Sequence, residues 1–419
     1  MSYGVSYSDV SHSLEKNEIA IEFVDYEKIS KTGEEDSQEV YYCALVVKPD
    51  GKVPSMVPLC SQSDLNECIK IGENAYDYSN PSSGKLYDLI WKPLEKYVKK
   101  GSTIYFSPAG SLSQVAIESI ATPQKKPLSE SYSLYRVSST KRICQEVQTR
   151  PFTSSVLYGG LQYDVSEDLM ISQSREYLNR SQRKSGPTST FRGNSRSGWG
   201  YLPGTMAEIE ALSDLFKQKN IRYSSYTGIY GNEESFKSLS GTDASIIHLA
   251  THGFYLNPNE VKRVSYFERV LSSNSLGTTE NDPMKRSGLI LSGGNMAWQG
   301  RLVSSDIEDG VLTAEEISNM HLENTELVVL SACESGLGDL SSDGVMGVQR
   351  AFKNAGVQTL IMSLWKVDDN ATKLLMTSFY QHLLEGDAKR QAFDKAKAEV
   401  RKDSRYSNPH YWAAFIMLD

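Results

Sequence analysis

The second half of the chain alternates continuous apolar runs with amphipathic stretches, and this pattern restricts the fold more than any other feature. The apolar runs, which predict buried strands, are residues 244–251, 326–332, 358–365 and 411–418. The amphipathic stretches, which predict helices, are residues 211–220, 344–356, 369–386 and 388–403. Such alternation indicates an α/β fold with a mostly parallel sheet covered by helices on both faces. Ligands of such sheets bind at the carboxyl ends of the strands.

The first half of the chain also has α/β character. Its predicted strands are residues 18–26, 40–51 and 102–110, and residues 85–100 predict a helix that Pro93 kinks or divides. Residues 1–16 are polar and aperiodic, which is typical of a tail or a linker. We therefore expect a tail at 1–16, an amino-terminal half at 17–172, a basic flexible loop at 173–200 and a second half at 201–419.

Composition excludes several classes of protein. A hydrophobic fraction of 39% is enough for a large core, which excludes wholesale disorder. No apolar run approaches the ~18 residues of a membrane span, and the first residues lack the features of a signal peptide. A net charge of −8 disfavours direct nucleic-acid binding. The five cysteines form no C-x-x-C pair, which favours a reduced, cytoplasmic protein. We expect neither a metal nor another cofactor.

The stretch 173–201 is rich in Arg, Ser and Gly and poor in aliphatic residues. So long a loop inside a compact domain is usually functional or disordered. Two interpretations stay open: a solvated surface loop, or an activation loop that is sensitive to proteolysis or cut by the protein itself.

Two residues that could perform chemistry follow predicted strands of the second half. His252 comes just after one strand and is followed by Gly253, and Cys333 comes just after the next strand. If the two strands are parallel neighbours, their ends meet at one sheet edge. An imidazole there could accept the thiol proton, because a thiol of pKa about 8.5 is mostly protonated near neutral pH. The backbone N–H groups of Gly253 and Cys333 could hold a tetrahedral oxyanion.

The motifs that surround this pair follow one another in a fixed order. They are HLATHGF (248–254), SGLILSGGN (287–295), DGVLTAEEI (309–317), LVVLSACESGLGD (327–339), GVMGVQRAFKNAG (344–356), SLWKVDDNAT (363–372) and PHYWAAFIML (409–418). Together they resemble the CHAT domain, a branch of the caspase–separase clan of cysteine proteases. IAIEFVDY, YYCALVVKPDG and IYFSPAGSLSQVAIESI, in the first half, resemble the amino-terminal part of that family.

The resemblance implies a caspase-like fold, with a degenerate, pseudo-caspase-like amino-terminal half. It also implies an endopeptidase in which His252 is the general base and Cys333 the nucleophile, acting on a protein substrate. Such proteins belong to bacterial, including antiviral, defence or cell-death pathways, and a regulatory sensor or effector partner switches them. Two departures stand out: Glu334 follows the cysteine where caspases carry Arg or a similar residue, and the helical repeats common before the protease are absent from this sequence.

Asp368 and Asp369 have two interpretations. An aspartate before the predicted helix at 370–385 is typical of an N-cap. The alternative comes from the resemblance of LWKVDD (364–369) to a separase segment that binds a basic P1 residue. Aligned in that way, Asp369 would line the S1 pocket and favour Arg or Lys, because a carboxylate pairs with guanidinium bidentately.

Three other functions stay open. The fold could serve as a catalytically silent interaction scaffold, the cysteine and histidine could act on a small molecule, or the protein could be a metal hydrolase. The metal hydrolase is disfavoured, since His248 and His252 lack the helical H-E-x-x-H pattern of zincins. We therefore predict that His248 is a core residue. Thr205 and Glu208 predict a capping box at the start of a helix.

Overall fold

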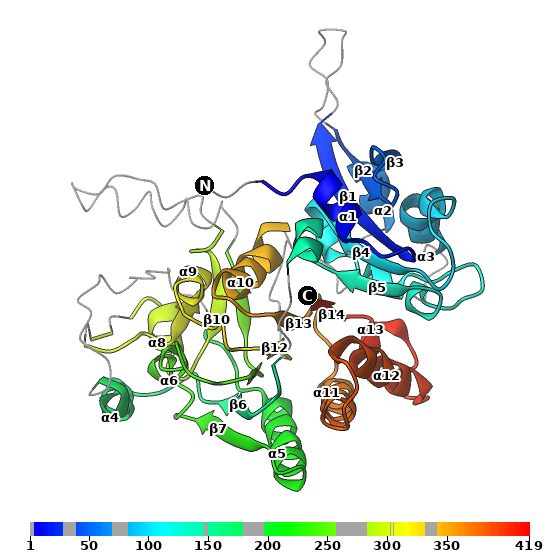
Figure 1. Ribbon diagram of the computed structural model, residues 1–419. Coiled ribbons are helices and arrows are strands. Elements are labelled where there is room, and N and C mark those ends of the chain that lie inside the picture. Colours follow the sequence, from blue (N-terminus) through cyan, green and yellow to red (C-terminus); the bar gives the residue numbers. More distant parts are fainter. Residues whose placement is uncertain are drawn as a thin grey trace, which may run out of the picture. The chain divides into compact units, whose positions relative to one another are not determined.

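The computed structural model describes residues 4–27, 39–68, 83–145, 150–178, 197–256, 283–301, 303–304, 306–331 and 342–419 (Figure 1). The chain divides into two units. Unit 1 is formed by Met1–Thr149 together with Lys389–Asp419, and unit 2 by Arg150–Ala388. The expected division, with a boundary loop at 173–200, therefore differs from this one at both ends of unit 2.

Unit 1 contains a mixed sheet with the strand order β3-β2-β1-β4-β5-β14. Its strands are β1 (Glu18–Glu27), β2 (Val40–Val47), β3 (Ser55–Ser61), β4 (Thr103–Ser107), β5 (Ser133–Arg136) and β14 (Phe415–Leu418). The β1, β4, β5 and β14 strands run parallel, whereas β2 pairs antiparallel with β1, and β3 pairs antiparallel with β2. The last strand of the chain thus belongs to the amino-terminal unit.

The helices of unit 1 are mostly short. They are α1 (Tyr7–Ser13), α2 (Gln62–Cys68), α3 (Ser83–Leu86), α12 (Lys389–Lys402) and α13 (Pro409–Trp412). The helix predicted at 85–100 is divided: α3 passes into one π turn, and a 3-10 turn holds Pro93. The amino-terminal tail prediction is wrong for residues 7–13, because Ser6 and Asp9 form a capping box and Val10 is buried against Val47.

Unit 2 contains a fully parallel sheet with the strand order β13-β12-β8-β6-β7. Its strands are β6 (Ser154–Leu161), β7 (Arg222–Gly228), β8 (Ile246–Leu249), β12 (Leu327–Leu330) and β13 (Thr359–Ser363). A small antiparallel sheet, β11-β10-β9, is built from β9 (Gly253–Tyr255), β10 (Ser287–Ile290) and β11 (Val311–Thr313). The predicted parallel α/β architecture is confirmed here.

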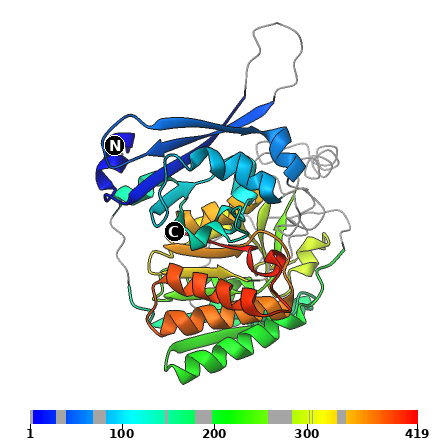
Figure 2. The same cartoon turned by 90° about the vertical axis from the view of Figure 1, so that its right-hand side faces the viewer.

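The helices of unit 2 explain why its central strands are buried at every position. They are α4 (Glu167–Leu178), α5 (Pro203–Gln218), α6 (Glu233–Lys237), α8 (Asn295–Trp298), α9 (Ala314–Ser318), α10 (Ser342–Asn354) and α11 (Asp369–Leu384). Figure 2 shows the long helices α5 and α11 running side by side, and α10 packs against α9. Gly356 and Gly386, both with φ +102°, follow α10 and α11, so the two predicted helix ends are confirmed.

Candidate active site

The strands that precede His252 and Cys333 are direct neighbours. β8 and β12 pair in parallel, with Leu249 opposite Leu330, and the Ser331 N–H donates to the Leu249 carbonyl oxygen at 3.0 Å. β13 pairs in parallel with the other side of β12. The expected arrangement of the strands is therefore confirmed. Cys333 itself lies outside the described residues.

His252 is completely buried just beyond β8. Its Nε2 lies 2.7 Å from the carbonyl oxygen of Gly200. Since a carbonyl oxygen only accepts, Nε2 carries the proton in this contact, and in the neutral ring the lone pair is then on Nδ1. The imidazole also packs against two aromatic rings, those of Tyr163 and Trp199, each with its centroid 4.8 Å away. The ring orientation of His252 is thus fixed by one hydrogen bond and by contacts with two aromatic rings.

Gly253 begins β9 directly after His252. It is opposite Leu289 of β10 in the antiparallel register and is partly exposed. The backbone of His252 joins the same small sheet, because its carbonyl oxygen accepts from the Ile290 N–H at 2.9 Å. The segment that carries the imidazole is therefore anchored on both sides, by β8 before it and by β9 after it.

Asp368 is the N-cap of α11. Its Oδ1 accepts from the N–H groups of Asn370 at 3.0 Å and Ala371 at 3.1 Å, so the N-cap prediction is confirmed. Asp369 is the first residue of the helix, and its carboxylate accepts from the Gly204 N–H. Partial burial and then the charge of Asp368 raise the pKa of Asp369. Both side chains are largely exposed and follow the carboxyl end of β13.

The capping box predicted at Thr205 and Glu208 is wrong. The α5 helix begins earlier, at Pro203, and Thr205 lies inside it, where its Oγ1 accepts from the Gly160 N–H at 2.8 Å. Glu208 is buried instead, with Oε1 3.0 Å from Nε2 of His248. The other ring nitrogen of His248 lies 3.2 Å from the Tyr380 hydroxyl. His248 is therefore a core residue, as predicted.

The basic loop is shorter than predicted at both ends. Residues 173–178, including Arg175, are part of α4, and Trp199 and Gly200 contact the imidazole of His252. The residues between them, 179–196, lie outside the described residues. Sequence reasoning missed the Gly200 contact because main-chain acceptors carry no residue signature. The only signal was SGWGY (197–201), where two glycines flank a tryptophan in an otherwise basic, polar stretch.

Comparison with known proteins agrees with this architecture. The model of the family described as "CHAT domain" matches residues 80–419, which is most of the chain and includes parts of both units. The chain belongs to the CHAT-domain family.

CHAT domains are caspase-like, protease-related domains, so the predicted family and fold class are both confirmed. The chain is also similar to tetratricopeptide repeat protein 28 of Homo sapiens, with 28% identity over 223 residues, or 52% of this chain and 8% of that protein. The Mus musculus protein of the same name is 32% identical over 108 residues, or 26% of this chain and 4% of that protein. The chain thus spans less than a tenth of the length of these curated relatives.

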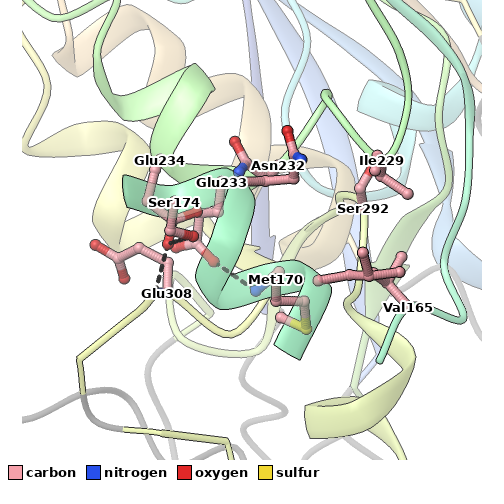
Figure 3. A pocket seen from close by; sticks show the side chains of 12 residues that line it. Val165, Met170, Ser174, Ile229, Asn232, Glu233, Glu234, Ser292 and Glu308 are labelled. Carbon is pink, nitrogen blue, oxygen red and sulfur yellow. Dashed lines mark hydrogen bonds between the residues drawn. The ribbon is translucent and has the colours of Figure 1, made fainter. Parts of the chain in front are cut away.

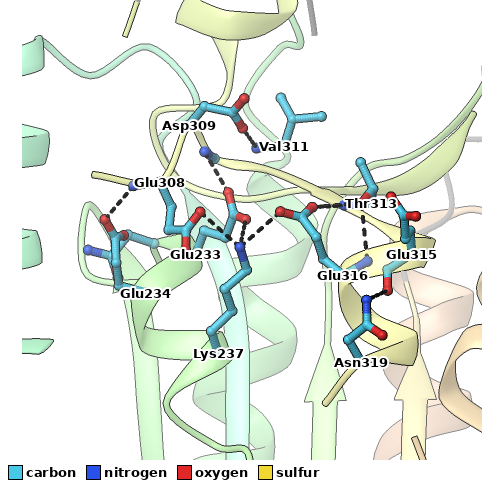
Figure 4. Close-up of polar contacts among 12 residues, drawn as sticks. Glu233, Glu234, Lys237, Glu308, Asp309, Val311, Thr313, Glu315, Glu316 and Asn319 are labelled. Carbon is cyan, nitrogen blue, oxygen red and sulfur yellow. Dashed lines mark hydrogen bonds and ion pairs between the residues drawn. The ribbon is translucent and has the colours of Figure 1, made fainter. Parts of the chain in front are cut away.

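This CHAT domain also holds a cluster of carboxylates that could be mistaken for a metal site. Among the described residues, Glu233, Glu308 and Glu316 have oxygens close enough to share an ion. Figure 4 shows that Lys237 fills the centre instead, with Nζ 2.7, 2.8 and 2.9 Å from the three carboxylates in that order. Burial alone would lower the pKa of Lys237, but the surrounding glutamates raise it. The Lys237 ammonium group therefore already occupies the position that a metal ion would take.

Beside this cluster, α4 and the segments around Asn232 and Gly310 enclose a pocket (Figure 3). The pocket offers about 10 Å³, roughly the room of one water molecule. Ser174 and the Glu308 N–H both donate to Oε1 of Glu234, at 2.5 and 2.9 Å. This pocket of the CHAT domain is a structural junction rather than a substrate site. No helix among the described residues combines the length and apolarity that crossing a membrane requires.

Proposed function

We propose that this CHAT domain is a cysteine endopeptidase in which Cys333 is the nucleophile and His252 the general base. The observation that carries the proposal is the parallel register of β8 and β12. Leu249 and Leu330 are partners, His252 is three positions beyond the first, and Cys333 is three positions beyond the second. Chain geometry limits Cys333 to within roughly 7 Å of Ser331, measured between Cα atoms. This distance limit supports a contact between the Cys333 sulfur and the His252 imidazole.

The contact between His252 and Gly200 supports a specific proton path. With Nε2–H donated to the Gly200 carbonyl oxygen, Nδ1 is the atom that accepts the Cys333 thiol proton. The thiolate attacks the carbonyl carbon of the scissile peptide bond, and the negative charge moves to the carbonyl oxygen. When the C–N bond breaks, the imidazolium gives its proton to the leaving amine. Water then attacks the thioester carbon while His252 accepts a proton from it. The C–S bond breaks, the acid product leaves, and the imidazolium returns its proton to the thiolate, which restores the thiol.

Two further roles belong to the proposal. The N–H groups of Gly253 and Cys333 hold the oxyanion, and the partly exposed position of Gly253 at the start of β9 leaves room for a substrate carbonyl. The Asp369 carboxylate, after the third parallel strand end, selects Arg or Lys at P1, with Asp368 beside it. A basic P1 preference would also make the Arg-rich segment of residues 179–196 a substrate for the enzyme itself.

Activation by a partner completes the proposed function. The curated relatives are named for tetratricopeptide repeats, which supports a helical-repeat region, on the same chain or on another, as the regulatory element. A role in bacterial defence or cell death stays a prediction from the family resemblance.

Profiling of a peptide library with wild-type protein and the Cys333→Ala variant tests the proposal. We expect cleavage by the wild type and none by the variant, and retained cleavage would exclude Cys333 as the nucleophile. A thiol-directed peptide electrophile should label Cys333 and lose that labelling in the His252→Ala variant. Cys68→Ala is the matched control, because burial raises the pKa of the Cys68 thiol and its loss should change neither result. Intact fold with neither cleavage nor labelling would favour the silent scaffold.

A further inference from the structure

The Gly200 carbonyl that meets His252 belongs to a segment, residues 197–202, which we call the strap. The strap itself is neither helix nor strand. Its main chain is fixed at Trp199 by the side chain of Asn295 from α8. Asn295 Oδ1 accepts from the Trp199 N–H at 2.7 Å, and its Nδ2 donates to the Trp199 carbonyl oxygen at 3.0 Å. One amide side chain therefore binds both main-chain polar groups of the residue next to Gly200.

Asn295 is well placed for this task because it is itself rigid. Its side chain is fully buried, and its backbone N–H donates to the Tyr163 carbonyl oxygen at 3.1 Å. The ring of Tyr163 is one of the two that pack on His252. Trp298, one turn later in α8, packs on Trp199 with ring centroids 5.0 Å apart. The same short helix thus holds the strap by hydrogen bonds and by aromatic contact.

The strap approaches α8 so closely that a side chain at position 198 would force its neighbours to shift. A Cβ atom on Gly198 would lie 2.6 Å from Nε2 of Gln299 and 2.9 Å from Nδ2 of Asn295. Contacts below 3.0 Å force a shift, and the Asn295 amide cannot yield without giving up its bonds to Trp199. The close packing of Gly198 against Asn295 is therefore a second observation, besides the hydrogen bonds, which indicates that this amide positions the strap.

We propose that Asn295 is a positioning residue for the His252 base. It holds Trp199, and through it the Gly200 carbonyl, so that His252 keeps its proton on Nε2 and offers Nδ1 to the thiol. This inference rests on the proposed function, but its structural part, the control of the His252 tautomer, does not need turnover. In this proposal Asn295 acts on the imidazole through Trp199 and Gly200 and does not bind the substrate.

The Asn295→Ala variant tests the proposal with two measurements. Misplacement of a catalytic group by about 1 Å costs on the order of 100-fold in rate, so kcat should fall about 10- to 100-fold while KM changes little. Nitrogen-15 NMR of labelled histidine gives the second readout. The chain has six histidines, and the His252 signals are assigned by their loss in His252→Asn. Wild type should show the Nε2–H tautomer, and Asn295→Ala a mixture of both.

A control and a second variant make the result decisive. Asn232→Ala removes another buried amide of unit 2, the N-cap of α6, and should lower stability while leaving kcat and the tautomer unchanged. Gly198→Ala keeps the Asn295 side chain but displaces the strap, so it should reproduce the Asn295→Ala signature even if that variant folds poorly. An unchanged His252 tautomer in both Asn295→Ala and Gly198→Ala would overturn the role of Asn295. Cleavage by Cys333→Ala would instead overturn the assignment of Cys333 as the nucleophile, so the two failures are distinguishable.

Discussion

The carboxylate of Asp369 accepts a hydrogen bond from the main-chain N–H of Gly204 and thereby joins the first turn of α11 to the first turn of α5. A Cβ atom on Gly204 would lie only 2.1 Å from Oδ2 of Asp369. The contact therefore fixes the position of the carboxylate that we propose for the S1 pocket, and it separates Asp369 from its neighbour Asp368, which only caps its own helix.

This difference predicts that substitution of Asp369 changes P1 preference, whereas substitution of Asp368 changes stability. Asp369→Asn should lower kcat/KM for Arg and Lys at P1 by at least about tenfold, because a neutral amide loses the charge-assisted pair. Asp368→Ala should cost about 1 kcal/mol of stability through loss of the N-cap and leave P1 preference unchanged. Peptide profiling with thermal unfolding measures both effects. Gly204→Ala displaces the Asp369 carboxylate without removing it and should mimic Asp369→Asn. An unaltered preference in Asp369→Asn would remove Asp369 from the pocket.

The proposed dyad predicts a specific change in the pH profile of cleavage. Loss of the base in His252→Ala should lower the rate about 10²- to 10⁴-fold. The remaining activity should then need an already ionised thiol, so its rise should move toward the ordinary thiol pKa of about 8.5. Initial rates from pH 5 to 10, on a peptide cleaved by the wild type, measure this shift. A profile identical to that of the wild type would show that His252 is not the base.

A buried ion pair in unit 1 predicts acid sensitivity. Arg136 donates to both carboxylate oxygens of Glu118, at 3.0 Å each, and both side chains are buried. Burial alone would raise the pKa of Glu118, but the charge and hydrogen bonds of Arg136 outweigh it and lower the pKa. The stabilisation is therefore complete above the unfolded pKa of about 4.3 and is lost as the pH falls through the lower, folded value.

The Glu118→Gln variant should lose about 3–5 kcal/mol of stability at pH 7, since it leaves the Arg136 charge buried without its partner. Urea unfolding followed by the fluorescence of Trp91, which is buried in the same unit, measures the loss. Asp403→Asn breaks an exposed pair with Arg405 and is the matched control, with an almost unchanged midpoint. A midpoint for Glu118→Gln equal to that of the control would contradict the importance of the buried pair.

In unit 2, Asp309 predicts the opposite pH dependence. Burial, with the charges of Glu316 and Glu308, raises the pKa of Asp309 to about 7. The folded chain therefore keeps a proton that the unfolded chain releases at its ordinary pKa of about 3.9, so the free energy of unfolding falls as the pH rises between about 4 and 7.

Asp309→Asn should flatten this slope and make the variant more stable than the wild type above pH 7. The amide keeps an oxygen that can accept from the Val311 N–H, now 2.9 Å from Oδ1 of Asp309. Urea midpoints at several pH values test this, with Asp306→Asn, an exposed residue of the same loop, as the control. Parallel curves for Asp309→Asn and wild type would exclude Asp309 as the titrating group.

The features of unit 2 that could be predicted from sequence depend on local patterns. Continuous apolar runs identified β8, β12 and β13, and a glycine placed the ends of α10 and α11, because hydrophobic period and positive φ are properties of the segment itself. The Asp368 N-cap was predicted for the same reason. Each of these features needs only residues within one turn or one strand.

The features that sequence reasoning missed are contacts between distant segments. Gly200 and His252 are 52 positions apart, and the bond is made by a main-chain carbonyl that any residue could supply. Glu208 has the spacing from Thr205 of a capping box, but its side chain is buried and contacts His248 instead. The composition of residues 7–13 predicts a tail because few of them are apolar, although Val10 and Leu14 suffice to dock helix α1.

The return of the chain to unit 1 at Lys389 has a consequence for biosynthesis. Strand β14 pairs with β5, where Leu418 is opposite Arg136, so one edge of β5 stays open until Leu418 has left the ribosome. All of the residues of unit 2 emerge before that moment. Chains that are arrested during synthesis, or cleaved, before β14 (Phe415–Leu418) would therefore present an incomplete amino-terminal sheet to chaperones and proteases, although every residue of the proposed catalytic machinery had already been translated.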